Sequence, residues 1–204
     1  MQTNDKKENQ RVRLTKALLK EALLRIMAKK ELSHVSIKEL CEEAGINRST
    51  FYQHYGDQYG LLREIEDELL EKVRAQLEKI DSSAESILYI ESLLRSFRSE
   101  PELCRILFCC NEHSAFHDKC FALILDQFTQ RVQLKNREGD GHFVLTFLIN
   151  GALCLIQQWI GEGYRVSCED LARLIYRLCD NATRGILQFS VPAATNEKKE
   201  PSAH

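Results

Sequence analysis

The sequence predicts an all-α protein of about nine helices. Apolar residues recur at steps of three and four along most of the chain, which is the period of an amphipathic helix. No segment alternates apolar and polar residues long enough to indicate a β-strand. The 204 residues include only 3 Pro and 9 Gly, so few positions interrupt a helix. The 44% apolar and 28% charged composition is that of an ordinary globular protein with one or two domains.

Each helix is expected from its apolar periodicity and from the residues that end it. Leu14 to Met27 gives the first helix one apolar face, and Pro101 suits the first turn of a later helix. The expected helices lie at about 14–27, 37–44, 48–55, 58–80, 84–98, 101–108, 114–134, 143–161 and 167–189.

The stretch from Ser36 to Tyr55 predicts two short helices joined by a tight turn. Ser36 and Glu39 have the spacing of a capping box at a helix start. Gly45 supplies the left-handed residue that commonly ends a helix, and Asn47 offers a second N-cap. Helix, glycine turn and helix together are typical of a helix-turn-helix that binds DNA.

The second of these helices carries polar groups suited to nucleic acid. Arg48 can read guanine, and Gln53 and Asn47 can read adenine. Thr50, Tyr52 and His54 suit phosphate oxygens. The full set of expected DNA contacts is Ser36, Asn47, Arg48, Ser49, Thr50, Tyr52, Gln53, His54 and Gln58. The alternative is an ordinary pair of helices with a solvated polar face.

This region resembles the N-terminal domain of TetR/AcrR-family transcriptional regulators. The residues in register are Ala44, Gly45, Ile46, Thr50, Phe51, Tyr52, His54, Tyr55, Leu61 and Leu62. Ser49 replaces the usual Gly, and Gln58 stands where a Lys often contacts phosphate. The resemblance implies a DNA-binding homodimer, more commonly a repressor than an activator. It also implies a C-terminal domain in which a small-molecule or protein effector changes the affinity for DNA.

The chain is expected to divide into four parts. We predict a mobile arm at 1–10, a helix-turn-helix domain at 11–57, an effector-binding and dimerisation domain at 58–189, and a disordered tail at 190–204. Residues 1–60 hold 11 Lys and Arg against 8 Asp and Glu, a net +3, whereas residues 61–204 hold 17 against 22, a net −5. A mildly basic head on an acidic body fits local contact with DNA. Arg11 and Arg13 at the mouth of the first helix are further candidates for phosphate contact.

Two groups of apolar residues in the C-terminal domain invite functional interpretation. Aromatic residues on several helices either line an effector pocket or form ordinary core: Phe97, Phe108, Phe116, Phe121, Phe128 and Trp159. Residues 143–161 contain no charged side chain, which suits either a helix buried on more than one side or a membrane span. We favour the buried helix, because Asn150 and Gln157 would be costly in hydrocarbon. Together with 167–189 it predicts a dimer interface through Gly151, Leu155, Trp159, Leu171, Leu174, Ile175, Leu178 and Ala182.

The remaining constellation is a run of cysteine and histidine. Cys110, His113, His117 and Cys120 would share one face of a continuous helix, but such a helix spreads them over three turns, too far for one metal ion. A metal or thiol sensor built on residues 109–120 therefore stays an alternative, as does a co-regulator whose body binds a partner protein. We expect no resident metal, no cofactor and no enzyme, because no phosphate-binding glycine loop or catalytic motif occurs. Without an apolar leader segment the protein is expected in the cytoplasm, where its eight Cys stay reduced.

Overall fold

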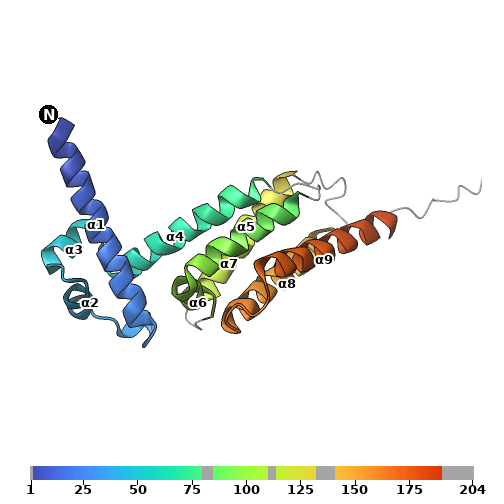
Figure 1. The fold of residues 1–204 in the computed structure, drawn as a ribbon. Helices are drawn as coiled ribbons and strands as arrows, with labels where there is room; N and C mark the ends of the chain where they lie inside the picture. Colours follow the sequence, from blue (N-terminus) through green and yellow to red (C-terminus); the bar gives the residue numbers. More distant parts are fainter. Residues whose placement is uncertain (1, 80–84, 110–113, 132–140, 190–204) are drawn as a thin grey trace, which may run out of the picture.

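The computed structural model describes residues 2–79, 85–109, 114–131 and 141–189, which form nine α-helices, one 3₁₀ turn and no strand (Figure 1). This confirms the predicted all-α class. The helices are α1 (Gln2–Met27), α2 (Ile37–Ala44), α3 (Arg48–His54), α4 (Gln58–Leu77), α5 (Ser86–Ser99), α6 (Pro101–Cys109), α7 (Ser114–Arg131), α8 (Gly141–Gly161) and α9 (Cys168–Phe189). The 3₁₀ turn η1 (Leu32–His34) lies between α1 and α2.

The first three helices form a head whose apolar core is continuous with that of the body. Leu19 and Leu23 of α1, Leu40 of α2 and Phe51 of α3 are all fully buried. The chain turns sharply between α2 and α3 because Gly45 takes the left-handed conformation, with φ +65°. Helix α2 packs on α1, and the turn lets α3 pack on α2 (Figure 1).

Helix α1 begins much earlier than expected. We predicted a mobile arm over residues 1–10, whereas the structure continues α1 back to Gln2. Residues 2–13 contain neither Pro nor Gly and are rich in Lys, Glu, Gln and Arg, which are good helix formers. The segment therefore extends the helix that follows it instead of ending it. The expected tail at 190–204 lies outside the described residues.

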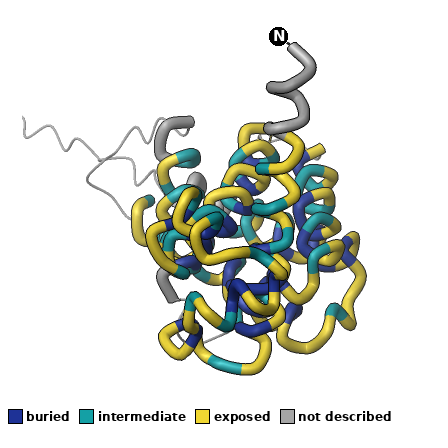
Figure 2. The backbone as a smooth tube through the Cα atoms, turned by 90° about the vertical axis from the view of Figure 1, so that its left-hand side faces the viewer, coloured by how far each residue is buried: buried dark blue, intermediate teal, exposed yellow. Residues whose placement is uncertain are grey.

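Helix α4 connects the head to the body formed by α5 to α9 (Figure 1). One side of α4 is apolar and buried over its whole length, from Leu61 to Leu77. In the body α5 packs on α9, α6 packs on α8, and α4 packs on both α5 and α7. Figure 2 shows the buried positions gathered between the helices and the exposed ones along the outside.

Helix α8 is less buried than its composition indicated. We expected burial on more than one side, but Phe143 and Phe147 are 74% and 76% exposed. In the part of the chain that the structure describes, α8 is also the one helix whose length and apolarity would suit a membrane span. Its inner side packs on α6, α7 and α9, and Phe143 and Phe147 lie on its exposed side in the part of the chain that the structure describes. A second apolar face therefore remains for another molecule to cover.

Candidate nucleic-acid interface

Helix α3 is held in the head by two aromatic residues and presents its other side to solvent. Phe51 is fully buried and Tyr55, at the C-cap, is 6% exposed; their ring centroids lie 5.7 Å apart. This spacing of four residues anchors one face of the helix in the core. The opposite face is therefore free to meet a large flat or grooved partner.

The residues predicted to contact DNA lie on this free face. Arg48, Ser49, Tyr52 and Gln53 are exposed, and Thr50 and His54 are half-buried. Asn47 takes the extended N-cap conformation, but its side chain makes no capping hydrogen bond. Its amide group therefore keeps both donor and acceptor for an outside partner. The predicted polar surface thus exists as one continuous helix face, and its DNA contacts remain a prediction.

The predicted capping box at the start of α2 is half formed. The backbone N–H of Glu39 donates to the Ser36 hydroxyl at 3.2 Å, as expected. The Glu39 carboxylate instead accepts from the Lys30 ammonium at 2.6 Å, because Lys30 at the end of α1 brings a full charge close to it. Ser36 itself is exposed, and its contact with DNA remains a prediction.

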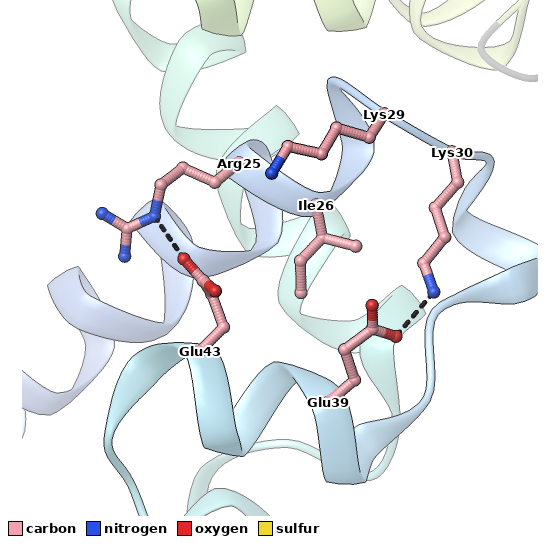
Figure 3. Close-up of a pocket in the computed structure, with 6 residues that line it drawn as sticks. All are labelled: Arg25, Ile26, Lys29, Lys30, Glu39 and Glu43. Carbon is pink, nitrogen blue, oxygen red and sulfur yellow. Dashed lines mark hydrogen bonds and ion pairs between the residues drawn. The ribbon is translucent and has the colours of Figure 1, made fainter.

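A second cation–carboxylate pair links α1 to α2. Arg25 lies 2.8 Å from Glu43, and both pairs border a small cavity of about 120 Å³ (Figure 3). Pockets for drug-sized ligands usually hold 300–1,000 Å³, so this one is too small for such a ligand. Four of its five charged lining residues are joined in pairs, Arg25 with Glu43 and Lys30 with Glu39. We interpret these ion pairs as contacts that fix the position of α2, and therefore also the turn to α3.

The start of α4 carries a cation that the sequence did not reveal. Gln58 is the first residue of α4 and is half-buried, and Asp57 caps the helix by accepting from the Gly60 N–H at 2.7 Å. The Arg63 guanidinium folds back over Gly60 to within 3.9 Å of Asp57. A positive charge therefore stands near the position where Gln58 replaces the usual Lys. The one hint of this arrangement in the sequence is Gly60, because its lack of a side chain leaves room for the Arg63 guanidinium.

Four charged residues join the head to α4. The Glu64 carboxylate lies 2.9 Å from the Lys16 ammonium and 2.8 Å from that of Lys20, and Lys20 also reaches Glu68 at 2.5 Å. Burial tends to raise the pKa of Glu64, but the hydrogen bonds from both lysines lower it to about 2. The Lys16 ammonium also stands 5.5 Å above the ring of Tyr55. We call Lys16, Lys20, Glu64 and Glu68 the α1–α4 cluster.

The aromatic residues proposed for an effector pocket largely contact one another. Phe108 lies 5.4 Å from Phe97 and 5.2 Å from Phe116 between ring centroids, and all three are at least 94% buried. Phe121 and Phe128 of α7 are partly buried against the same core. The packing of the three rings is that of core, while the pocket itself remains a prediction.

Only part of the predicted dimer surface faces outward. Trp159, Leu171 and Ile175 are buried inside the subunit, so they do not form an exposed interface. Trp159 is held there because its indole N–H donates to the Val166 carbonyl at 2.8 Å and its ring lies 4.7 Å from that of Tyr164. The turn after α8 therefore covers Trp159, and the dimer interface itself remains a prediction.

Exposed apolar residues lie on both α8 and α9, and the predicted interface includes some of them. Of the predicted residues, Gly151, Leu174 and Leu178 are exposed, and Leu155 and Ala182 are half-buried. Phe143, Phe147 and Cys154 were missed, although their spacing with Gly151 places them on one helix face. We call Phe143, Phe147, Gly151, Cys154, Leu174 and Leu178 the α8–α9 patch.

The cysteine and histidine run does not form a described metal site. Cys110 and His113 lie outside the described residues, and the described part of the chain contains no group of three possible ligands. His117 is half-buried and Cys120 is buried on the straight helix α7. Burial raises the pKa of the Cys104 and Cys120 thiols to about 12 in each case, so little reactive thiolate forms there at neutral pH.

Comparison with known proteins assigns the two ends of the chain to two family models. The model described as bacterial regulatory proteins, tetR family, matches residues 19–65, and the one described as transcriptional regulator C-terminal region matches residues 85–181. An uncharacterized HTH-type transcriptional regulator of Bacillus subtilis (strain 168), YxbF, is 29% identical over 55 residues. That alignment spans 27% of this chain and 14% of the relative.

Solved structures share the fold over most of the chain. A TetR transcriptional regulator from Streptococcus agalactiae 2603V has a TM-score of 0.63 at 16% identity, over 84% of this chain and 97% of its own. The fatty acid degradation regulator FadR from Bacillus halodurans has a TM-score of 0.61 at 10% identity, over 83% and 96%. The dihydroxyacetone kinase operon activator DhaS has a TM-score of 0.55 at 19% identity, over 84% and 97%. At these identities the likeness is one of fold.

Proposed function

Since the chain belongs to the TetR family of transcriptional regulators, we propose that it is a repressor that binds DNA sequence-specifically as a homodimer. The observation that carries the proposal is the free face of α3, where Arg48, Tyr52 and Gln53 are exposed while Phe51 anchors the helix from behind. An α-helix fits the major groove of B-DNA, and these side chains match base edges and phosphates.

The side chains divide into two roles by their chemistry. Arg48 and Gln53 read base edges, with the uncapped amide of Asn47 as a third reader. Thr50, Tyr52 and His54 hold phosphates, and Ser36 and Arg63 extend the phosphate contacts to the starts of α2 and α4. In this assignment Arg63 makes the phosphate contact that a Lys at position 58 often makes, because Gln58 carries no charge.

The α8–α9 patch is the surface through which two subunits associate. Each subunit contributes two neighbouring helices, so a twofold dimer would close the patch in a four-helix interface. Gly151 leaves open space above it, which permits a partner helix to approach closely. Two α3 helices would then meet half-sites one turn of DNA, or a multiple of it, apart.

The body is proposed to sense an effector and to pass the change on through α4. Helix α4 packs on α5 and α7 in the body and on α1 in the head, so a shift in the body tilts the head. An effector that binds one tilt better than the other changes the DNA affinity by that difference. DhaS, which shares this fold, is named as an activator, so the sign of regulation needs a reporter assay.

The first experiment is binding to DNA from upstream of the gene, or to sites selected from random DNA, over a series of salt concentrations. Specific binding that weakens steeply with salt is expected. Arg48→Ala should lower affinity by roughly 1–3 kcal/mol and relax preference at one base position. Arg98→Ala, an exposed arginine of α5, is the control and should change neither. A folded dimer that prefers no sequence would refute the proposal, and uniform weakening by Arg48→Ala would make Arg48 a phosphate contact.

A further inference from the structure

The α1–α4 cluster joins α1, in the head, to α4, which leads into the body. Lys16 and Lys20 lie one turn apart on α1, and Glu64 and Glu68 lie one turn apart on α4. The two pairs therefore face each other in register, with Glu64 shared between both lysines. Such a ladder resists both sliding and rotation of α1 against α4.

The cluster also reaches the end of α3 through Tyr55. This residue is the C-cap of α3, its ring lies under the Lys16 ammonium, and its hydroxyl is buried without a hydrogen bond of standard geometry. Glu64 is close enough for its charge, after burial, to raise the pKa of that hydroxyl further. The end of the recognition helix is thus linked through Lys16 to the Glu64 carboxylate of the linking helix.

The opposite side of α4 is tied to the body. Glu66 is 4% exposed, and its carboxylate accepts from the Lys119 ammonium of α7 at 2.6 Å. Two residues along a helix correspond to a rotation of about 200°, so Glu64 and Glu66 point in opposite directions. Helix α4 is therefore held by charge on both sides, toward the head and toward the body.

We propose that Glu64 is a positioning residue for DNA recognition, because it holds Lys16, Lys20 and the Tyr55 end of α3 at one angle to α4. The Lys20 side chain is only 17% exposed and that of Glu64 28%, so water and salt screen this cluster less than a surface pair. The inference rests on the proposed DNA binding, and it adds a group that never touches DNA.

The test uses the sign of the effect. Removing a negative charge from a DNA-binding head by itself strengthens binding to any DNA. Loss of position instead weakens the specific site alone, because the base-reading side chains leave their register. We would measure binding of the full-length protein to its selected site and to an unrelated duplex of equal length. Glu64→Gln is the variant, and Asp67→Asn, an exposed carboxylate on the same helix, is the matched control.

We expect Glu64→Gln to lower the ratio of specific to unspecific affinity about tenfold, comparable to losing one base contact, with unspecific binding unchanged or stronger. Asp67→Asn should leave the ratio as in the wild type. An unchanged ratio in a folded Glu64→Gln protein overturns the inference. If circular dichroism shows that this variant does not fold, Lys20→Met, which removes the ion-pair partner of Glu64, gives the same test. A lower ratio of specific to unspecific affinity supports positioning, and an equal loss of affinity for both DNAs overturns it. A wild type without any specific site would instead refute the proposed function.

Discussion

Phe147 offers the most direct test of the proposed subunit interface. Its side chain is 76% exposed in one subunit, and a phenylalanine side chain buries about 200 Å² when fully covered. A partner could therefore cover roughly 150 Å² of it, which at about 25 cal/mol per Å² is at most about 4 kcal/mol. Alanine keeps the Cβ, so we expect Phe147→Ala to lose about 2–3 kcal/mol per subunit.

The effect on association is doubled, because a twofold interface contains the side chain twice. The loss of about 4–6 kcal/mol corresponds to at least a roughly thousandfold weaker dimer. Sedimentation velocity over a nanomolar-to-micromolar concentration series measures this directly. Leu88→Ala is the matched control, because Leu88 is 63% exposed on α5, outside the α8–α9 patch. A folded Phe147→Ala protein that dimerises like the wild type would show that the patch serves another partner.

Two further predictions concern acid stability and thiol reactivity. The pKa of Glu64 is about 2 in the folded protein against an ordinary 4.5, so the carboxylate stabilises the fold above pH 4.5, and this contribution is lost as the pH falls toward 2. The melting temperature of Glu64→Gln should therefore lie below that of the wild type at pH 6, and the two melting temperatures should converge near pH 2. A difference that does not change with pH would show that ionisation of Glu64 does not stabilise the fold. Cys154 is exposed, so mass spectrometry should find rapid alkylation of this thiol in monomeric Phe147→Ala and slower alkylation in the wild-type dimer. Cys104 is buried with a pKa of about 12, so it should not be alkylated before the protein unfolds. Equal rates at Cys154 in both proteins would count against its place in the interface.

The head could be predicted almost residue by residue, because its signals are local. The Ser36 cap, the left-handed Gly45 and the buried Phe51 each act through neighbours a few residues away. The free face of α3 follows directly, since anchoring Phe51 and Tyr55 turns the intervening polar residues outward. Three local expectations differed from the structure: α1 begins earlier than predicted, the Glu39 carboxylate pairs with Lys30 instead of capping α2, and the Asn47 side chain makes no capping hydrogen bond.

The body shows where sequence reasoning stops. Periodicity placed α8 and α9 within two residues of their observed bounds, yet it could not show which apolar residues meet their own subunit. Trp159 and Phe147 are both aromatic residues of α8, but the turn at Tyr164 covers the first, whereas the second is 76% exposed among the described residues. That difference depends on helices distant in the sequence.

The same limit applies to charge. Glu64 and Glu66 are both acidic residues of α4, and helical periodicity places Glu66 on the apolar face of this helix and Glu64 opposite it, but it does not show which residues either one meets. Packing places Glu64 against two lysines of the head and buries Glu66 against Lys119 of the body. The sequence by itself determined the helices, their caps and the polar face of α3, because hydrogen bonds and periodicity within a few residues specify them. Only the tertiary structure decided the exposed patch and the charge pairs that hold α4, because both depend on which helices meet in space.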